Sequence, residues 1–273
     1  MNVRNALKTA MLSDTGRARS RNEDTIGEDL DIGVVVLADG MGGHQSGDVA
    51  SALAVNAILR DLRLTIPAVS PGETDPATGY ALQRLAVRQA IVRANQAIYT
   101  SADADPHLHG MGTTLVMAIF YNDVITVANV GDSRLYRYRG NRLEQVTVDH
   151  TLRQELVDRG YCTPAEARAS LNKNLITRAL GTDVTVAIDL LDHAVLPGDL
   201  YLLCSDGLSD MLDDHEIQQA IERSPTNLEA IAERLVLMAN HNGGRDNISV
   251  ILIRACKSFP NKQAWQQRIS GWI

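Results

Sequence analysis

Short apolar runs and helical apolar stripes alternate along this chain of 273 residues. Residues 33–38 form a continuous apolar run of strand length that stops at Asp39-Gly40 and leads into the glycine-rich turn DGMGGHQSG. The next apolar positions recur with helical spacing, which predicts one face of an amphipathic helix with Ser46 as its N-cap. These positions are Ala50, Leu53, Ala54, Ala57 and Ile58.

A second helix is expected after residues 65–79, whose prolines and glycines indicate a connecting loop. Its apolar stripe comprises Leu82, Leu85, Ala86, Ala90, Ala94, Ala97 and Ile98. The pattern then becomes typical of strands separated by Asn-Asp, Gly-Asp-Ser and Gly-Asn turns, and this spacing predicts an antiparallel meander. The strands are expected at residues 113–121, 124–130, 134–139 and 142–148.

The last third of the chain returns to strands after a polar, helix-prone segment at about 150–182. Two helices are expected between Asp213 and His241. Strands are predicted at residues 184–193 and 199–205 and, as the closing element, at 247–254. This order predicts an α+β protein with antiparallel sheets rather than a parallel doubly wound sheet.

Composition narrows the class of protein. An apolar share of 45% supports a buried core in one large domain, and a net charge of −7 without a basic block disfavours binding to nucleic acid or to an anionic membrane. The odd, widely spaced set Cys162, Cys204 and Cys256 predicts a reduced, cytoplasmic setting. No stretch approaches the ~20 apolar residues of a membrane span, so neither export nor insertion is indicated.

Four aspartates stand beside glycine or asparagine at the ends of apolar runs: Asp39, Asp132, Asp206 and Asp246. A carboxylate at a buried strand end is costly to desolvate, so several converging ones call for a divalent cation. Oxygen ligands without Cys-His pairs favour magnesium or manganese over zinc. A two-metal hydrolase is therefore plausible, with Asp39 bridging the ions and the main-chain carbonyl of Gly40 free to approach one. Alone, the glycine run also fits a simple strand-to-helix turn.

The ordered motifs carry a family resemblance over residues 13–254. The chain resembles the type-2C, metal-dependent serine/threonine protein phosphatases, particularly their compact bacterial branch. That resemblance implies a sandwich of two antiparallel β-sheets flanked by pairs of α-helices, in four αββα layers. It also implies a phosphatase domain at 1–254 with a flap at about 150–182, followed by a C-terminal extension at 255–273. The motifs are SDTGRARSRNED, VLADGMGGH, GTTLV, ANVGDSRLYRYR, NLITRALG, LLCSDGLSDML and GGRDNISVIL.

Site roles follow from the resemblance by position. It implies two Mn²⁺ or Mg²⁺ ions bridged by Asp39, with Gly40 contributing its carbonyl. Asp206 and Asp246 would hold the first ion, and Glu23 would serve the second. Asp132 would share a third, weaker ion with Asp206, while Asn247 would support the ligands from behind. Arg19 would bind the phosphate dianion through its planar guanidinium.

Several positions leave alternatives open. Met41 stands where animal members often have a histidine, and His44, three residues later, would protonate the leaving group, position a water or cap the turn. Cys162 and Arg168 match the C-x5-R spacing of cysteine-dependent phosphatases, but Thr163, Pro164 and Glu166 fit a helix start better. Turn or cap roles are preferred for Asp210, Asp213 and Asp214.

The implied activity is hydrolysis of phosphoserine and phosphothreonine on proteins by a metal-activated water, opposing a serine/threonine kinase. Phosphorylated proteins are the expected partners of a monomer. The alternatives are a catalytically silent, phosphoprotein-binding regulator and a hydrolase of small phosphate esters. In the flap, basic residues would attract phosphopeptides or simply be solvated: Arg153, Arg159, Arg168, Lys173 and Arg178. In the tail, packing on the same chain is expected for Trp265, Ile269, Trp272 and Ile273.

Overall fold

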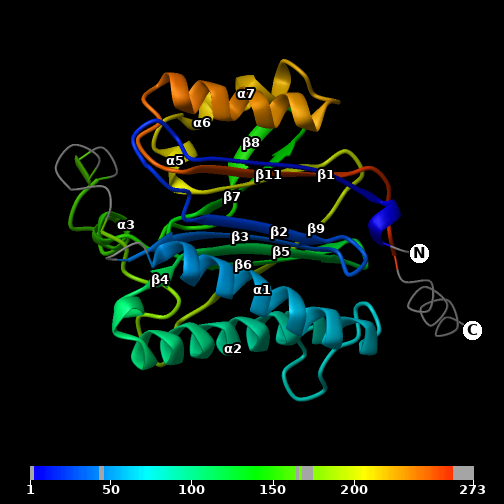
Figure 1. The fold of residues 1–273 in the computed structure, drawn as a ribbon. Helices are drawn as coiled ribbons and strands as arrows, with labels where there is room; N and C mark the ends of the chain where they lie inside the picture. The colour runs from blue at the N-terminus through cyan, green and yellow to red at the C-terminus, as the bar shows by residue number, and fades with distance from the viewer. Residues whose placement is uncertain (1–2, 43–45, 164–165, 168–174, 261–273) are drawn as a thin grey trace, which may run out of the picture.

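Two antiparallel β-sheets pack face to face, and a pair of helices covers each outer face (Figure 1). The computed structural model describes residues 3–42, 46–163, 166–167 and 175–260. The helix, sheet, sheet, helix layering is the α+β architecture that the sequence predicted. Both sheets contribute side chains to the apolar layer between them, including Leu37, Phe120, Tyr201 and Ile251.

The first sheet has five strands and is covered by helices α6 (Asp214–Glu222) and α7 (Leu228–His241). All of its pairings are antiparallel. Its strands, in spatial order, are β1 (Leu7–Asp14), β11 (Ile248–Ala255), β10 (Leu200–Cys204), β7 (Arg134–Arg139) and β8 (Arg142–Gln145).

The second sheet is covered by helices α1 (Gly47–Thr65) and α2 (Leu82–Ala104). A short strand, β4 (Gly112–Thr113), pairs with the end of β3. The main strands, in spatial order, are β2 (Asp24–Asp29), β3 (Val34–Met41), β5 (Leu115–Tyr121), β6 (Val124–Val130) and β9 (Asp189–Ala194). The short helices are η1 (Val3–Asn5), η3 (Ile66–Ala68), η4 (Pro106–Leu108), α3 (Leu152–Asp158) and α5 (Asp206–Ser209).

The predicted meander is wrong at one connection. Strands β5 and β6 pair, and so do β7 and β8, but β6 and β7 belong to different sheets. The chain crosses between the sheets at Gly131, whose φ of +107° and contact with Thr114, 2.7 Å from a hypothetical Cβ, require glycine. This crossover places Asp132 beside the ends of strands from both sheets.

Several strands also differ from the prediction in their bounds or in their existence. Strand β3 continues beyond Ala38 to Met41, because Gly40 and Met41 pair with β4. The polar N-terminal segment contains strands β1 and β2, which the apolar pattern did not reveal. Strand β9 begins only at Asp189 rather than at residue 184. Polar residues on partly exposed edge strands weaken the alternation on which a sequence prediction depends.

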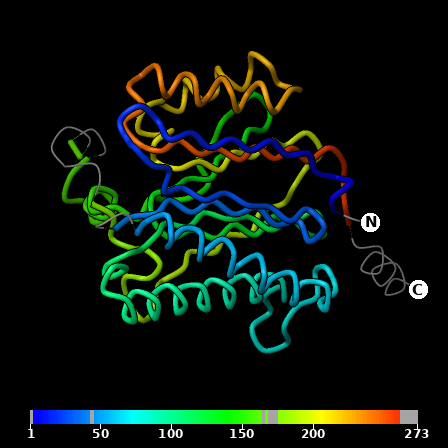
Figure 2. Tube along the Cα trace, in the orientation of Figure 1, coloured from blue at the N-terminus to red at the C-terminus, as the bar shows by residue number. Residues whose placement is uncertain are grey.

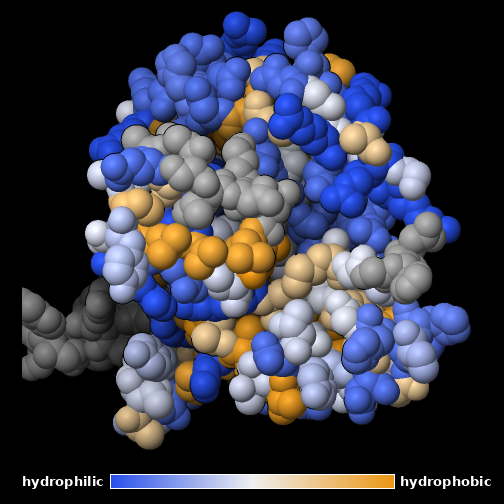
Figure 3. All heavy atoms as spheres, turned by 90° about the vertical axis from the view of Figure 1, so that its left-hand side faces the viewer, coloured by the Kyte–Doolittle hydropathy of each residue, from blue (hydrophilic) through white to orange (hydrophobic). Residues whose placement is uncertain are grey.

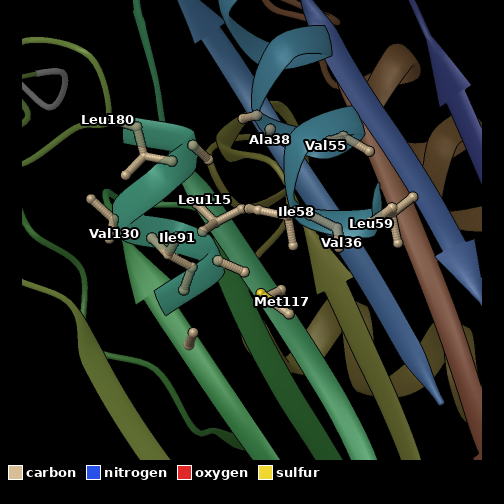
Figure 4. Packing of buried hydrophobic residues seen from close by; sticks show 14 of the residues in the cluster. Val36, Ala38, Val55, Ile58, Leu59, Ile91, Leu115, Met117, Val130 and Leu180 are labelled. Carbon is tan, nitrogen blue, oxygen red and sulfur yellow. The ribbon is translucent and has the colours of Figure 1, made fainter. Parts of the chain in front are cut away.

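The helices pack on the sheet with faces close to the predicted ones. In α1, Ala50, Ala54 and Ile58 are buried, although Ser46 makes no side-chain capping hydrogen bond. In α2 the buried stripe includes Val87 and Ile91, whereas the predicted Ala97 is exposed. Figure 4 shows side chains from both helices meeting those of the sheet in this cluster.

One end of the sandwich collects the strand ends of interest, with β4, α5 and α3 at the left of Figure 1. The described chain begins and ends at the opposite end (Figure 2). No helix in the described part of the chain is long and apolar enough to cross a membrane. The three cysteines are free, and Cys204 is buried. The tail residues from Trp265 onward lie outside the described residues, so their packing stays a prediction.

The packing generates a stability prediction for two neighbouring residues of α2. Ile91 is fully buried, whereas Val92 is 41% exposed. Ile91→Ala is expected to lower the free energy of unfolding by about 2–5 kcal/mol because it leaves a cavity between helix and sheet. Val92→Ala should change it by less than about 0.5 kcal/mol. Urea denaturation followed by circular dichroism measures both, and equal effects would contradict the described packing.

Candidate metal centre

The four predicted aspartates come from four different strand ends at the same end of the sandwich. Asp39 lies near the end of β3, and Asp132 follows β6. Asp206 opens α5 directly after β10, and Asp246 precedes β11. Two sheets with antiparallel strands thus bring together residues that are up to 207 positions apart in the sequence.

Burial and repulsion by neighbouring carboxylates raise the pKa values of Asp39, Asp132 and Asp206. The pKa of Asp39 lies well above its ordinary value, first because of burial and then because Asp24, Asp206, Asp132 and Asp246 are near. Burial likewise raises the pKa of Asp206 strongly, with Asp132 and Asp246 adding to the effect. Asp39 and Asp206 are partly buried residues, and the charge of Asp206 acts on the carboxyl group of Asp39. A cation would relieve this repulsion.

Burial also raises the pKa of Asp132 to about 6, and the Asp149 carboxylate adds to the shift. The Oδ1 atoms of Asp132 and Asp206 are buried and have no hydrogen-bond partner among the described residues. A buried carboxylate oxygen without a donor is costly, and a metal ion is one partner that would satisfy it. The all-oxygen donor set therefore fits Mn²⁺ or Mg²⁺.

Gly40 and Glu23 form a second part of the centre. The Gly40 N–H donates to the Glu23 carbonyl at 3.1 Å. The start of α1 packs so closely that a Cβ on Gly47 would lie 2.9 Å from the Gly40 carbonyl oxygen and 3.0 Å from Glu23 Cδ. The Gly40 carbonyl and the Glu23 carboxyl group are thus neighbours, and both are placed to serve one cation.

The arrangement of the side chains and their raised pKa values differ on whether a metal ion binds here. Among the described residues, no three His, Cys, Asp or Glu side chains are arranged as a ready metal-binding group. Arg19 Nη2 donates to Asp246 Oδ2 at 2.8 Å, so one of the four carboxylates already has a partner. The Gly40 carbonyl would be a main-chain ligand, so it is not part of such a group of side chains. The converging charges are the stronger indication, because small side-chain rotations change ligand distances but cannot separate four strand ends.

Asn247 holds the loop that carries Arg19 and Glu23. Its Oδ1 accepts from the Glu23 N–H at 2.8 Å, and its Nδ2 donates to the carbonyls of Thr15 and Arg21 at 2.9 and 2.8 Å. A single buried amide thus ties three points of this loop to the start of β11. These bonds support the positioning role expected for Asn247.

Asp24 is a buried carboxylate that the sequence reading missed. It pairs directly with Asp39 in the β2–β3 register, and its Oδ2 accepts from Ser205 Oγ at 2.8 Å. Burial raises its pKa to about 6. From the sequence, the Glu23-Asp24 pair also fitted a solvated acidic surface. Only the recognition of β2 as a strand would have placed Asp24 opposite Asp39.

The remaining candidates divide into three groups. Asp213 caps α6 in a capping box with Glu216, as expected, while the charge of Asp210 contributes to the raised pKa of Asp132 and Asp206. Reciprocal hydrogen bonds between Thr163 and Glu166 support the helix start rather than a phosphate cradle beside Cys162. His44, Pro164, Arg168 and Lys173 lie outside the described residues.

A groove of about 870 Å³ is lined by Asp149 and Asp210, whose charges act on Asp132. Its walls are α3, with Arg153, Gln154 and Val157, and the segment from Ser209 to Glu216, while Arg134 and Asp149 lie between them. Figure 3 looks onto this end of the molecule, where hydrophilic residues cover the upper part and a band of apolar residues crosses the middle. Of the flap cations predicted to attract phosphopeptides, Arg178 pairs with Asp189 and Arg159 with Glu155.

Comparison with known proteins decides the family. The model of the protein phosphatase 2C family matches residues 16–248. The chain belongs to the protein phosphatase 2C family. It is therefore a hydrolase of the serine/threonine protein phosphatase class. The serine/threonine phosphatase Stp of Listeria welshimeri is 37% identical over 244 residues, which cover 88% of this chain and 93% of the Listeria protein.

Solved structures of this phosphatase family share the fold. The crystal structure of the Mycobacterium tuberculosis serine/threonine phosphatase PstP has a TM-score of 0.79 at 36% identity, covering 91% of this chain and 98% of that one. The catalytic domain of PstP in complex with two manganese ions has a TM-score of 0.77 at 35% identity, covering 91% and 97%. The family resemblance and the sandwich fold inferred from the motifs are thereby confirmed.

The raised pKa of Asp132 predicts how pH affects stability in the presence of a chelator. Between its unfolded value of 3.8 and its folded value of about 6, the folded state holds more protons than the unfolded chain. Stability is therefore expected to fall as pH rises through this window. Asp132→Asn should raise the free energy of unfolding at pH 7.5 by about 1–3 kcal/mol, and this gain should shrink toward pH 4.

The measurement is urea denaturation in EDTA at several pH values. Glu233→Gln, an exposed position in α7, serves as the control and should leave stability unchanged at every pH. A destabilised Asp132→Asn protein with the same deficit at pH 4 and pH 7.5 would contradict the electrostatic account.

Proposed function

We propose that this enzyme hydrolyses phosphoserine and phosphothreonine on proteins by direct attack of a water activated at a binuclear Mn²⁺ or Mg²⁺ centre. The observation that carries the proposal is the convergence of Asp39, Asp132, Asp206 and Asp246 at one end of the sandwich. The pKa values of Asp39, Asp132 and Asp206 are raised, and the unpartnered Oδ1 atoms of Asp132 and Asp206 call for divalent cations. The name of the PstP complex, with its two manganese ions, supports the same reading.

The chain's own residues fit a two-ion centre with a third, weaker position. Asp39 would bridge the ions, because the charges of Asp24, Asp206, Asp132 and Asp246 all act on its buried carboxyl group. Asp206 and Asp246 would complete one position, and the Gly40 carbonyl with Glu23 the other. Asp132 and Asp206 would share the third. When bound, the ions would supply Lewis acidity for the phosphate and lower the pKa of the attacking water.

Arg19 would bind and orient the phosphate. It belongs to the loop that Asn247 holds through hydrogen bonds, and its side chain is half exposed beside Asp246. A planar guanidinium offers two parallel donors to phosphate oxygens, so a phosphate would draw Arg19 from the exposed Asp246 contact at small cost. This exchange would hold the phosphate ester against the carboxylate cluster. The part of His44 in protonating the leaving group stays a prediction.

Protein substrates and an opposing serine/threonine kinase are the finer part of the proposal. They are supported by the names of the relatives, which are serine/threonine phosphatases, and by the groove lined by Asp149 and Asp210, which is large enough for residues flanking a phosphorylated side chain. The cytoplasmic location and the monomeric state stay predictions, as do the domain division at residue 254 and the substrate role of the flap.

Phosphate release from a phosphothreonine protein tests the proposal. Activity is expected with Mn²⁺ or Mg²⁺, none with excess EDTA, and a loss of at least about 100-fold in kcat for Asp39→Asn. Turnover of small phosphate esters without turnover of phosphoproteins would favour the small-ester hydrolase. Absence of both activities, with phosphoprotein binding retained, would instead favour the silent regulator.

The phosphate-binding role of Arg19 generates a kinetic prediction. Arg19→Met should lower kcat/KM for a phosphothreonine protein by about 10- to 100-fold, because a charge-assisted hydrogen bond is worth about 1.5–3 kcal/mol. Arg17→Met is the matched control: this exposed arginine lies on the same loop, and kcat/KM should stay within about twofold. Inorganic phosphate should also inhibit the Arg19→Met enzyme less. Equal effects of the two substitutions would contradict the assigned role.

A further inference from the structure

Three charged or polar side chains meet where the flap joins the body of the protein. His150 is buried, with 5% of its side chain exposed, and stands at the start of the flap. Arg178 lies near the end of the flap, and Asp189 begins strand β9. Arg178 Nη1 lies 3.0 Å from Asp189 Oδ1, and His150 Nε2 lies 3.1 Å from Asp189 Oδ2. None of the three belongs to the candidate metal centre.

The hydrogen bonds of His150 determine its tautomer. The Gly131 N–H donates to Nδ1 at 3.0 Å, so Nδ1 acts as the acceptor. The ring proton of a neutral His150 therefore lies on Nε2, which donates to Asp189. Arg178 Nη1 is 3.2 Å from Nε2, but since both atoms carry protons, each is directed to Asp189 rather than to the other. The carboxylate of Asp189 thus accepts from both ends of the flap.

The same residues fix the flap to the turn that carries Asp132. The His150 N–H donates to the Gly131 carbonyl at 2.9 Å, so Gly131 is held by both the main chain and the side chain of His150. Gly131 in turn packs on Thr114, whose hydroxyl accepts from the Asp39 N–H at 3.1 Å. Three contacts, two of them hydrogen-bonded, therefore link the junction to the main chain of Asp39.

Main-chain hydrogen bonds connect the flap junction to helix α3. The Thr177 N–H donates to the His150 carbonyl and the Leu152 N–H to the Leu175 carbonyl, each at 2.9 Å, while Thr151 bridges Ile176. Thr151 also caps α3 through a hydrogen bond from the Gln154 N–H. Since Arg153, Gln154 and Val157 of α3 line the groove, the position of this wall depends on the flap junction.

We propose that His150, Arg178 and Asp189 form a latch that sets the distance between α3 and the segment from Ser209 to Glu216, and that protein substrates require this spacing while small phosphate esters do not. The inference rests on the proposed phosphatase activity, because it assigns the groove to the polypeptide flanking the phosphorylated residue. The latch residues act by positioning α3, without touching the phosphate. Binding of protein substrates should therefore depend on them more than turnover does.

Arg178→Met tests the latch because it removes the ion pair while keeping a long apolar side chain. We expect the KM for a phosphothreonine protein to rise about 10-fold, with kcat and the kcat/KM for p-nitrophenyl phosphate within about twofold of wild type. Arg178→Lys should restore the KM to within about threefold, since Arg178 reaches Asp189 through Nη1 alone and a lysine can supply one such donor. Arg159→Met, which removes an exposed flap pair, is the control and should match wild type.

Amide hydrogen exchange supplies a readout that does not depend on activity. Residues 150–158 and 175–178 should exchange faster in Arg178→Met than in Arg159→Met, with the core strands unchanged. If Arg178→Met does not fold, Asp189→Asn removes the opposite charge of the same ion pair with a smaller change of shape. Unchanged exchange, or equal losses on the phosphoprotein and on p-nitrophenyl phosphate, would overturn the latch. A wild-type enzyme inactive on every ester would overturn the proposed function and, with it, the role of the latch in substrate binding. The positioning of α3 by the latch would then be tested by hydrogen exchange alone.

Discussion

The structure depends on the cost of holding several carboxylates close together inside a protein. Asp39 and Asp206 are surrounded by other acidic groups, and burial together with this repulsion raises their pKa values well above the ordinary range. No single strand or hairpin could create such a cluster, because neighbouring side chains along a strand point to opposite faces. The two-sheet sandwich does so by directing the ends of β3, β6 and β10 and the start of β11 to one end.

Apolar packing in the rest of the protein offsets the loss of folding stability that this carboxylate cluster causes. Apolar layers lie between the sheets and under both helix pairs, and these layers account for most of the favourable burial. Close main-chain approaches then shape the centre itself. A Cβ on Gly40 would lie 2.0 Å from the Gly47 carbonyl oxygen, and one on Gly207 would lie 2.0 Å from that of Asn247. Glycine at both positions allows helices α1 and α5 to start directly beside the carboxylates.

The sequence predicted the four converging aspartates because each of them stands in a local motif. An aspartate beside glycine at the end of an apolar run is visible without a structure, and so are Arg19 and Glu23 once the motif order is recognised. Asp24 and His150 were missed for a different reason. Asp24 matters because β2 places it opposite Asp39, and His150 because Gly131, Arg178 and Asp189 surround it. Such contacts arise only from the tertiary fold.

The errors in the predicted fold have the same origin. Residues 124–130 and 134–139 are both strands, but the spacing of apolar residues cannot show that Gly131 carries the chain from one sheet to the other. Strands β1 and β2 are partly exposed and polar, so their alternation is weak. The predicted apolar face of α2 was partly wrong, because alanines fit both buried and exposed helix positions. Ala97, which was predicted to lie on this face, is exposed.

Direct measurement of manganese binding tests the central claim that the converging carboxylates form a divalent-cation centre. Titration of the full chain with Mn²⁺, with free ion followed by electron paramagnetic resonance, is expected to show two ions bound per chain at micromolar concentrations. Asp206→Asn should lose at least one of them. Failure of the wild-type protein to remove Mn²⁺ from solution would contradict the account, because the carboxyl groups of Asp39, Asp132 and Asp206 would then converge without holding a cation.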